Sequence, residues 1–211
     1  MRAIPVANPV VADPIRAGAL LLRPTRLTDA ADLAALMSPG ISRWVASWPP
    51  RLTAETCATL LQKSLTQPGL VWHFTLIDTG AEPASEAGAK PAATTGPATD
   101  PETGAETRPA TIIGALKLHR EQLTDSSVEL GYWIGAAFHG RGFATSAAQA
   151  AITYAFDVLG MKSVTAGAQL ANEASNGLLQ KLGMTRLADA QIFAPARGRM
   201  EPCSSWEITA P

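Results

Sequence analysis

The sequence predicts a single α/β domain built around a mixed, mostly antiparallel β-sheet. Residues 127–168 run through a strand-like stretch, a glycine turn, a helical stretch and a second strand-like stretch, which is the order of a βαβ unit with two parallel strands. The other strand-like runs are typical of antiparallel neighbours. Without two segments that lack a continuous apolar pattern, about 160 residues remain, which is the size of one globular domain.

The first part of the chain predicts an arm, a strand and two helices. Residues 1–19 contain three prolines and no continuous apolar core, so we interpret them as a flexible arm and not as a signal peptide. Residues 20–24 form an apolar run that ends at a proline, as expected of a short strand. Thr28 and Thr53 are expected to cap helices that extend to about residues 37 and 65.

Residues 80–110 differ from the rest of the chain, because they contain no Val, Leu, Ile, Met, Phe, Trp, Tyr or Cys. Ordering a residue costs about 1–2 kcal/mol of backbone entropy, and this segment has little to bury in return. We therefore expect a disordered, low-complexity insertion. The flanking runs 70–78 and 111–119 favour strands, so the insertion is expected to enlarge a hairpin loop within a domain that spans residues 20–211.

The second half of the chain alternates strand and helix patterns. From Gly142 onward, apolar residues recur at helical spacing until Gly160. A second helix is expected between a capping residue, Asn172, and a terminating glycine, Gly183. Strands are expected over residues 127–134, 163–168, 184–188 and 204–209.

The turn between the strand at 127–134 and the long helix carries the first chemical signal. It has the sequence His139-Gly140-Arg141-Gly142-Phe143-Ala144-Thr145. Its small residues allow a ligand to come close to the backbone, and successive N–H groups at the positive end of a helix favour a phosphate group. Arg141 adds a charge that suits phosphate. A purely structural glycine turn explains the same residues equally well.

Several other classes of site are excluded. A dinucleotide-binding fingerprint would need glycine at Thr145, and the Walker A, GxSxG and HExxH motifs are absent. Cys57 and Cys203 lie far apart and the three histidines show no ligand spacing, so we expect neither a disulfide framework nor a metal site. No apolar run approaches the roughly 18 residues of a membrane span. A net charge of −1 lacks the basic character of a nucleic-acid-binding surface.

Four stretches together resemble a known family. They are Glu-Leu-Gly-Tyr-Trp-Ile at 129–134, His-Gly-Arg-Gly-Phe-Ala at 139–144, Asn172-x-x-Ser175-Asn176, and Lys-Leu-Gly-Met at 181–184. They resemble the GNAT acyltransferase superfamily, and within it the ribosomal-protein N-terminal acetyltransferases of the RimJ/RimL type. The resemblance runs from about Leu20 to Thr209, interrupted by the insertion. The family's pyrophosphate loop, Gln/Arg-x-x-Gly-x-Gly/Ala, matches residues 139–144 except that His139 replaces the usual first residue.

The resemblance implies a fold and a site for the co-substrate. The family's mixed sheet has two central parallel strands that splay apart, with helices on both faces and acyl-coenzyme A in the gap. Here these strands would be 127–134 and 163–168. The residues implied to hold acetyl-coenzyme A are Trp133, Ile134, His139, Gly140, Arg141, Gly142, Phe143, Ala144, Thr145, Asn172 and Asn176. No metal is expected.

The implied reaction is direct transfer of an acyl group to an amine, which requires a base and a group that serves the leaving thiolate. An α-amine with a pKa of about 7.7–8.0, or a lysine with one of about 10.4, is largely protonated near pH 7. By resemblance, Glu129 would accept the proton through water, and Ser175 would serve the thiolate. The structural alternatives are a solvent-facing strand residue at Glu129 and helix capping by Asn172 and Ser175.

The acceptor side is expected to involve Trp44 and Trp48, because the loop that contains them helps to form the acceptor pocket in this family. Packing of these rings in the core is the equally good alternative. His119, at the end of a predicted strand, is a reserve base or a simple edge histidine.

The sequence therefore favours a cytoplasmic N-acetyltransferase that acts on a protein N-terminal amine, as a monomer or homodimer. A small-molecule amine, such as an amino acid, a polyamine or an aminoglycoside, is the alternative acceptor. A non-catalytic acyl-coenzyme A sensor is the alternative class of protein. Glu129 and Ser175 together favour the enzyme, because a sensor needs neither. No membrane or nucleic-acid partner is expected.

Overall fold

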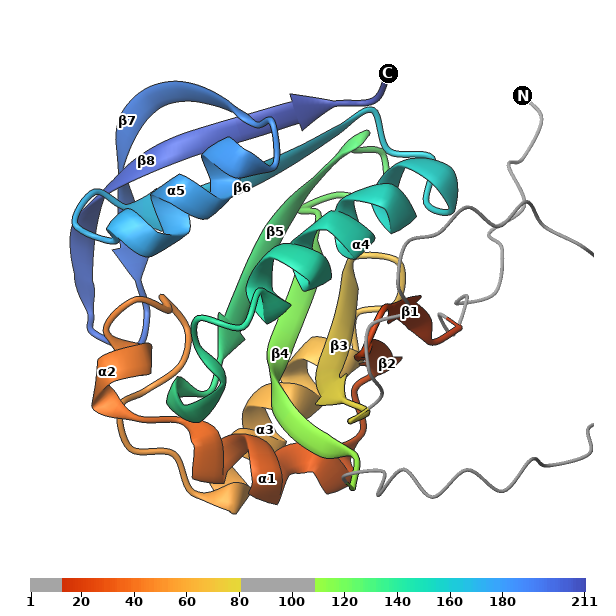
Figure 1. Cartoon of the computed structure of the whole chain (residues 1–211). Coiled ribbons are helices and arrows are strands. Elements are labelled where there is room, and N and C mark those ends of the chain that lie inside the picture. The colour runs from red at the N-terminus through yellow and green to blue at the C-terminus, as the bar shows by residue number, and fades with distance from the viewer. Residues whose placement is uncertain (1–12, 81–108) are drawn as a thin grey trace, which may run out of the picture.

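Eight strands form one open sheet in residues 13–80 and 109–211, the part of the chain that the computed structural model describes. Their order across the sheet is β1-β2-β3-β4-β5-β6-β8-β7, and β5 and β6 are parallel whereas the other neighbours are antiparallel (Figure 1). The strands are β1 (Ile15–Ala17), β2 (Leu20–Pro24), β3 (Val71–Asp78), β4 (Thr111–His119), β5 (Ser127–Ile134), β6 (Ser163–Gln169), β7 (Thr185–Ala194) and β8 (Arg199–Thr209).

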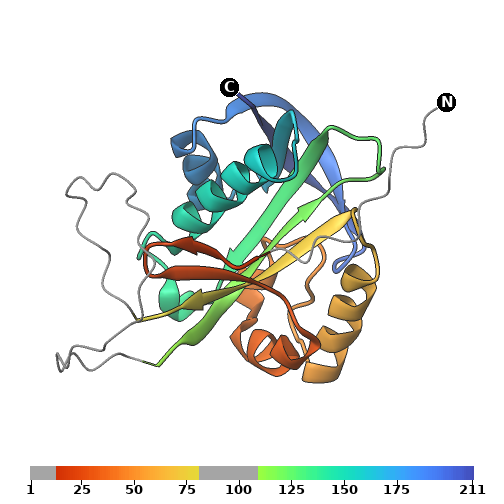
Figure 2. The same ribbon diagram turned by 90° about the vertical axis from the view of Figure 1, so that its right-hand side faces the viewer.

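Helices cover both faces of this sheet (Figure 2). One face carries α1 (Ala30–Leu36) and α3 (Ala54–Leu65), with the short α2 (Pro39–Ser42) between them in the chain. The other face carries α4 (Phe143–Asp157) and α5 (Glu173–Lys181). Two 3₁₀ turns, Leu27–Asp29 and Ala136–Phe138, precede α1 and α4.

Alternation along the strands builds a separate core on each face. On β5, Val128 and Leu130 join a cluster with Leu116 of β4 and with the buried side of α4. Trp133 has the opposite parity on β5 and belongs to the cluster of Leu33 and the helices α1 and α3. The sheet separates the two cores, so residues of one strand reach two different environments.

The parallel strands β5 and β6 separate soon after they begin. Their pairing covers Ser127–Glu129 opposite Ser163–Thr165, whereas β5 continues to Ile134 and β6 to Gln169. Over the rest of their length, β5 is held by β4 and β6 by β8. Each strand therefore has one edge without a neighbouring strand beyond Glu129, and backbone groups on such an edge are free to bind a ligand.

The predicted fold class is confirmed. The sheet is mixed and mostly antiparallel, the parallel pair includes the strand at 127–134, and the long helix follows Gly142 as expected. β3 and β4 are antiparallel neighbours, with Asp78 opposite Thr111, so the predicted insertion over 80–110 does join two paired strands. Residues 81–108 of that insertion lie outside the described residues.

Two predicted boundaries near the N-terminus are wrong. Residues 15–17, expected within a flexible arm over 1–19, pair with β2 as an edge strand, because Ile15 packs against the core on the α4 face. Thr28 does not cap α1. The helix begins after a 3₁₀ turn, and the Asp29 carboxylate accepts a hydrogen bond from the backbone N–H of Arg26 at 2.9 Å, which closes that turn instead.

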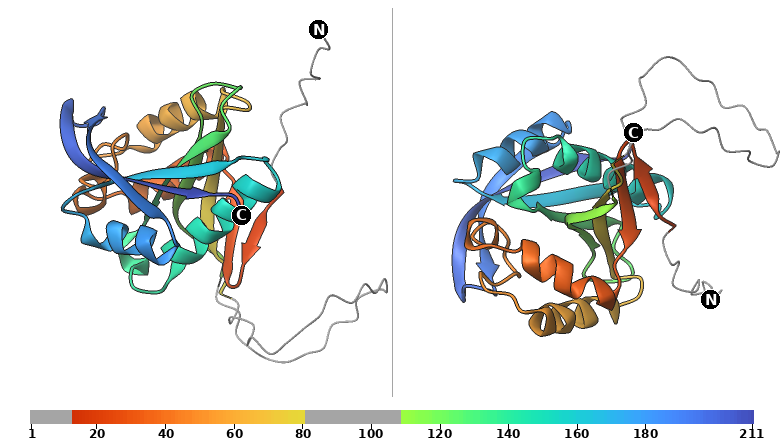
Figure 3. Two further views of the ribbon diagram at one scale, coloured as in Figure 1. Left: turned by 90° about the horizontal axis from the view of Figure 1, so that it is seen from above. Right: turned by 60° about the horizontal axis from the view of Figure 1, so that its bottom comes forward.

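The C-terminal hairpin is longer than the sequence predicts. β7 extends to Ala194 and β8 begins at Arg199, whereas strands over 184–188 and 204–209 were expected. β7 is exposed along nearly its whole length, so it lacks the apolar alternation by which a strand is recognised. β7 and β8 lie at one edge of the sheet and the β1–β2 hairpin at the other (Figure 3).

Candidate active site

A cavity of about 1090 Å³ lies where β5 and β6 separate. It is lined by the free parts of both strands, by the N-termini of α4 and α5, by the loop after α2 and by the turn between β7 and β8. All the site residues predicted from the sequence line this cavity except Arg141 and Asn176. The topology thus brings together segments that are up to about 160 residues apart in the chain, from Gly40 to Cys203.

The N-terminus of α4 opens into the cavity without a side-chain cap. Gly142 is the N-cap residue, and the helix's own hydrogen bonding begins with Ser146 N to Gly142 O at 3.0 Å. The N–H groups of residues 143–145 therefore take no part in the helix ladder. By contrast, the side chains of Thr53 and Asn172 cap α3 and α5. An uncapped helix N-terminus with free N–H groups is suited to a phosphate group.

Side chains of the turn before α4 hold it in place. His139 donates from Nε2 to the carbonyl oxygen of Ile134 at 2.8 Å, since a carbonyl only accepts. Arg141 forms an ion pair with Asp78 of β3 at 3.2 Å and lies over the ring of Phe143. Arg141 does not line the cavity, because the β3 carboxylate holds its guanidinium; its contact with the co-substrate stays a prediction.

The N-terminus of α5 faces β5 across the gap. Asn172 Oδ1 accepts a hydrogen bond from Ser175 N at 3.2 Å, so Asn172 caps the helix as predicted. The Ser175 hydroxyl lies 3.0 Å from that of Tyr132 on β5, and this hydrogen bond joins the two sides of the gap. Burial raises the pKa of Tyr132, and its bond to Ser175 opposes that rise, so the phenol stays protonated at neutral pH.

Sequence reasoning assigned no role to Tyr132, although it lies within the quoted stretch 129–134. Strand alternation places it on the same face of β5 as Leu130 and Ile134, which is the face where α5 approaches. That parity, combined with a hydroxyl at Ser175, is the signal that could have found the pair.

Asn176 stabilises the fold and does not line the cavity. Its amide nitrogen donates to the carbonyl oxygens of Gln169 and Asn172 at 3.0 and 2.9 Å. Its carbonyl oxygen accepts from Trp206 Nε1 at 3.2 Å and from the Ser204 hydroxyl. These bonds use the donors and the acceptor of the amide, so the structure shows a structural role for this side chain, and its contact with the co-substrate stays a prediction.

Glu129 lies at the fork of the two strands, in the last residue pair of β5 and β6. It is exposed, lines the cavity, and shares its face of the sheet with its register partners His119 of β4 and Thr165 of β6. Within residues 13–80 and 109–211 it forms no ion pair. An unpaired carboxylate at this position is free to accept a proton, directly or through water.

Tryptophan rings form one wall of the cavity. Trp48 is buried and packs edge-on against Trp133, with ring centroids 5.1 Å apart. Trp44 is half-buried, with the Arg43 guanidinium 4.4 Å above its ring. Trp48 therefore belongs to the core and to the cavity wall at once. The indole N–H of Trp133 is buried and has no hydrogen-bond partner among the described residues.

Arg197 fastens the loop after α2 to the turn between β7 and β8. It donates to the carbonyl oxygens of Ser42 and Val45 at 2.7 and 3.1 Å, and its fork pairs with both oxygens of Glu201 at 2.8 and 2.6 Å. Hydrogen bonds from Arg197 lower the pKa of Glu201 and outweigh the effect of burial. Sequence reasoning missed this pair, since nothing in a linear pattern connects residues this far apart.

A row of buried, hydrogen-bonded polar side chains extends from Asp29 to His73, which lies in the cavity wall on β3. The Thr75 hydroxyl lies 2.7 Å from Asp29 Oδ2 and 3.0 Å from the Thr25 hydroxyl, which in turn lies 2.8 Å from His73 Nδ1. His73 lines the cavity beside Trp48, with ring centroids 6.3 Å apart. The sequence assigned no role to His73, because a single histidine in a strand has no diagnostic spacing.

Arg23 keeps Asp29, the first residue of this hydrogen-bonded row, in its charged form. Burial raises the pKa of Asp29, but hydrogen bonds from Arg23, from the Arg26 N–H and from Thr75 outweigh it, and the pKa lies below its usual value. Asp29 is therefore ionised, and its ion pair with Arg23 is 2.8 Å long.

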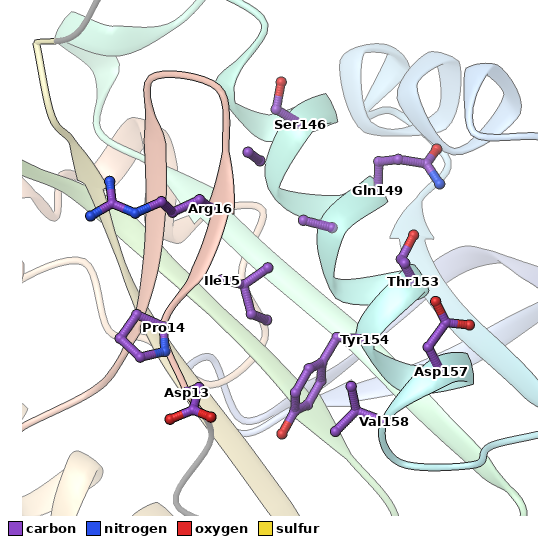
Figure 4. Close-up of a pocket in the computed structure, with 12 residues that line it drawn as sticks. Asp13, Pro14, Ile15, Arg16, Ser146, Gln149, Thr153, Tyr154, Asp157 and Val158 are labelled. Atoms are coloured by element: carbon purple, nitrogen blue, oxygen red, sulfur yellow. The ribbon is translucent and has the colours of Figure 1, made fainter. Parts of the chain in front are cut away.

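A second cavity, of about 680 Å³, lies between β1 and α4 (Figure 4). Ile15 of β1 and Tyr154 of α4 lie between the two elements, and the Tyr154 hydroxyl is buried with no hydrogen-bond partner in the described part of the chain. The cavity borders Asp13, the first described residue, and none of the site residues predicted from the sequence lines it.

Comparison with protein families and curated proteins gives two findings. A family model described as an acetyltransferase (GNAT) domain matches residues 19–185. YdaF of Bacillus subtilis (strain 168), named as a ribosomal N-acetyltransferase, is 34% identical over 73 residues, which are 35% of this chain and 40% of that protein. The match thus spans less than half the length of this relative.

Solved structures with the same fold include three with coenzyme A compounds. RimL, a ribosomal L7/L12 alpha-N-protein acetyltransferase in complex with coenzyme A, has a TM-score of 0.70 at 15% identity, over 93% of this chain and 98% of that one. RimJ of Mycobacterium smegmatis, in complex with CoA-disulfide, has a TM-score of 0.68 at 18% identity, over 94% and 86%. The microcin C7 self-immunity acetyltransferase MccE, in complex with acetyl-CoA and AMP, has a TM-score of 0.67 at 16% identity, over 95% and 94%. At these identities the likeness shows a shared fold.

The helices within the described ranges are too short or too polar to cross a membrane.

Proposed function

Because the chain belongs to the GNAT acetyltransferase family, we propose that it transfers an acetyl group from acetyl-coenzyme A to a primary amine, and that this amine is the α-amino group of a protein N-terminus. One observation carries the proposal. The gap between β5 and β6 has the uncapped N-terminus of α4 beyond the end of β5, the Ser175–Tyr132 pair across it, and Glu129 at its fork.

Backbone groups would hold most of acetyl-coenzyme A. The free N–H groups of residues 143–145 are suited to the pyrophosphate, with the positive end of α4 behind them. The free edge of β5 at Trp133 and Ile134 offers hydrogen bonds to the amides of the pantetheine arm, as a neighbouring strand would. Complexes of RimL, RimJ and MccE with coenzyme A compounds support this assignment.

Glu129 is the proposed base. The amine nitrogen attacks the thioester carbonyl carbon only as the free base, so a proton must leave it. Glu129 takes this proton through a water molecule, and help of this kind is typically worth about 10²–10⁴-fold in rate. For an α-amine near pH 7 the protonation to overcome is about 1 pKa unit, against roughly 3.4 units or about 4.6 kcal/mol for lysine. An N-terminal acceptor is therefore the easier substrate.

Ser175 is the proposed donor to the leaving group. As the bond between carbonyl carbon and sulfur breaks, the thiolate needs a hydrogen bond or a proton, and the Ser175 hydroxyl lies at the edge of the gap to give it. The Tyr132 hydroxyl can then donate a hydrogen bond to the Ser175 oxygen, which stabilises Ser175 as it gives up its own hydrogen bond or proton to the thiolate.

The names of the relatives support a ribosomal protein as acceptor, since YdaF is named as a ribosomal N-acetyltransferase and RimL as one that acts on L7/L12. The proposed setting is the cytoplasm, with the chain as a monomer or homodimer. Acetyl-coenzyme A and the acceptor are the proposed partners.

A free-thiol assay with acetyl-coenzyme A tests the proposal. The acceptors are peptides with free N-termini, matched peptides with acetylated N-termini and one lysine, single amino acids and polyamines. Thiol release with the free-N-terminal peptides alone is the expected result. Release with polyamines or amino acids alone would assign a small-molecule acceptor, and binding of acetyl-coenzyme A without release for any acceptor would indicate a sensor.

A further inference from the structure

Lys117 of β4 brings a positive charge into the floor of the cavity. It lines the cavity, is half-buried, and forms no ion pair or hydrogen bond within residues 13–80 and 109–211. Its neighbours Leu116 and Leu118 point into the core on the α4 face, so Lys117 points to the opposite face, where the tryptophan rings of the cavity wall lie. A partly buried cation without a partner is costly, and a bound anion would offset that cost.

The neighbours of Lys117 on this face leave its charge uncompensated. Its register partner on β3 is His73, which is neutral near pH 7 because burial, helped by the charge of Lys117, lowers its pKa to about 4. Its register partner on β5 is Gly131, which has no side chain. Among the described lining residues of β3, β4 and β5, the one carboxylate is that of Glu129, which lies diagonally opposite Lys117, about 7–8 Å away across the sheet.

The loop after α2 and the turn between β7 and β8, which form a wall of the cavity, carry more positive than negative charge. Arg197 and Arg199 both pair with the one carboxylate of Glu201, at 2.6 and 3.1 Å. The guanidinium of Arg43 lies 4.4 Å above the ring of Trp44 and forms no ion pair in the described part of the chain. The field on this side of the cavity therefore favours an acceptor that carries negative charge near its amine.

We propose that Lys117 selects protein acceptors whose second residue is Asp or Glu, by pairing with the carboxylate of that side chain. This inference rests on the proposed function, since it places the α-amine at the edge of β5, with Glu129 as its base. In an extended peptide the second Cα lies about 5 Å from the α-nitrogen, and neighbouring strands lie about 4.8 Å apart. An acceptor that runs from the edge of β5 toward β3 thus places its second residue above Lys117.

The path of the first residue across the floor is open. A Cβ atom added at Gly131 would meet no other atom within 4 Å, so the start of the acceptor can lie directly over β5.

The two charges of the floor discriminate between the candidate acceptors. Glu129 faces a group that arrives as an ammonium ion, and Lys117 faces the carboxylate that follows it. A polyamine would instead bring a second cation toward Lys117, which disfavours it.

The experiment changes one charge of the acceptor and one charge of the enzyme. The parent acceptor is the peptide amide Ser-Asp-Ala-Ala-Ala. Ser-Asn-Ala-Ala-Ala removes its charge, Ser-Lys-Ala-Ala-Ala reverses it, and Ser-Ala-Ala-Asp-Ala moves it to the fourth residue. Each is assayed by thiol release with the wild type, Lys117→Met, Lys117→Glu and the control Lys181→Met. Lys181 lines the same cavity from α5, on the other face of the sheet.

With the wild type, kcat/KM should be about 5- to 30-fold higher for the Asp peptide than for the Asn peptide, mainly through KM, which lies between an exposed ion pair and a buried charged hydrogen bond. The acid at the fourth residue should lose most of this gain. The preference should vanish in Lys117→Met, turn toward the Lys peptide in Lys117→Glu, and persist in Lys181→Met. Coenzyme A affinity by calorimetry should be unchanged in both Lys117 variants, which shows that they are folded.

Equal kcat/KM for the Asp and Asn peptides in the wild type would overturn the inference while leaving peptide acetylation intact. A preference for Asp that persists in Lys117→Met, or an equal gain from the acid at the fourth residue, would also overturn it, because the pairing would not involve Lys117. Weaker coenzyme A binding in a folded Lys117→Met protein would assign this charge to the co-substrate instead. Thiol release with polyamines or free amino acids but with none of the peptides would overturn both this inference and the proposed N-terminal acceptor.

Discussion

Two of the polar clusters that flank the cavity differ in burial and in charge. On the β2–β3 side, Asp29, Thr75, Thr25 and His73 form a buried chain anchored by the ion pair of Asp29 with Arg23. On the other side, one hydrogen bond between Tyr132 and Ser175 spans the gap. The first cluster lies between strands that are paired throughout, and the second where strands have parted.

This difference assigns different tasks to the two sides. A buried ionic network is costly to break, since loss of one partner leaves an uncompensated charge, so it holds its members in one geometry. A single neutral hydrogen bond contributes about 0.5–1.5 kcal/mol and yields more readily to an incoming ligand. We therefore expect the side with Asp29, Thr75, Thr25 and His73, the rigid side, to position the acceptor. The side with Tyr132, Ser175 and Glu129, the open side, is expected to serve the reacting atoms.

Replacing Glu129 should have the largest effect on the open side. Glu129→Gln keeps the size of the side chain and removes the base, so turnover should fall by about 10²–10⁴-fold while coenzyme A affinity stays the same. The loss should be greatest toward pH 6, where more of the amine is protonated. Steady-state rates across pH 6–8 measure it.

Glu207→Gln is the matched control for this change. Glu207 lies on β8, next to Thr165 on the same row of the sheet as Glu129, but it does not line the cavity. This variant should retain wild-type turnover. Equal rates for the two variants would remove Glu129 from the mechanism and leave the open side without its base.

On the rigid side, His73 should make the free energy of unfolding depend on pH. Burial lowers the pKa of His73 to about 4, from about 6.5 in the unfolded chain. Well above pH 6.5, His73 is neutral in both the folded and the unfolded protein, so its burial costs no stability through protonation. As the pH falls from 6.5 to 4, the unfolded state takes up a proton that the folded state refuses, and stability drops by about 2 kcal/mol at pH 5.

His73→Gln removes this titration, so its free energy of unfolding should depend less steeply on pH between 7.5 and 5 than that of the wild type. Urea unfolding at a series of pH values measures both curves. Parallel curves would show that His73 is not held neutral in the folded protein.

Gly142→Val tests the pyrophosphate site and should weaken coenzyme A binding by about 10- to 100-fold. Gly142 has φ 77°, a left-handed conformation that a β-branched residue strongly disfavours, so the free N–H groups at the start of α4 would be displaced. Gly160→Val is the control, because Gly160 has φ 65° and open space around it but lies away from the cavity. Calorimetry should show weakened binding only in Gly142→Val, and equal affinities would mean the site is misplaced.

The Ser175–Tyr132 pair should show a smaller, shared effect. Ser175→Ala should lower kcat by about 10-fold, as expected for loss of one hydrogen bond to a developing charge. Tyr132→Phe should cost less, since it acts through Ser175. If they act as a unit, the double variant should be no slower than Ser175→Ala alone, and additive losses would separate their roles.

Shortening the insertion should have the smallest effect. β3 and β4 pair up to Asp78 and Thr111, so replacement of residues 80–110 by Asn-Gly should restore a tight hairpin. Loop closure predicts a protein that is as stable or more stable by about 1–2 kcal/mol, measured by urea unfolding. Acetylation of small amines should persist. An unfolded product would refute the prediction, and loss of activity toward protein acceptors alone would make the segment a docking element.

The elements that the sequence predicted well are those with strong local signals. The strand at 127–134 matches β5, the glycine at 142 precedes α4, and the caps Thr53 and Asn172 are observed. Each depends on residues close together in the chain: a period of apolar positions, a glycine with positive φ, or an oxygen three residues before a free N–H. The weaker predictions, β1 and the ends of β7 and β8, concern edge strands, whose exposed side chains carry little pattern.

The family likewise followed from the sequence alone, because its motifs are contiguous stretches of the chain. The direction of individual side chains did not. Arg141 and Asn176 were expected at the co-substrate, but Asp78 holds the first and the α5–β8 interface the second. Those competing partners come from other strands, and no local pattern shows them.

The sequence by itself thus determined the order of the longer helices and strands, the parallel pair and the loop at the start of α4, because these follow from short-range propensity and spacing. Only the tertiary structure decided the acceptor side. His73, Lys117 and Arg197 reach the cavity through strand register and through contacts across more than a hundred residues for Arg197. Register is set by the packing of whole strands, so the neighbours of a side chain across a sheet emerge only when the sheet is assembled.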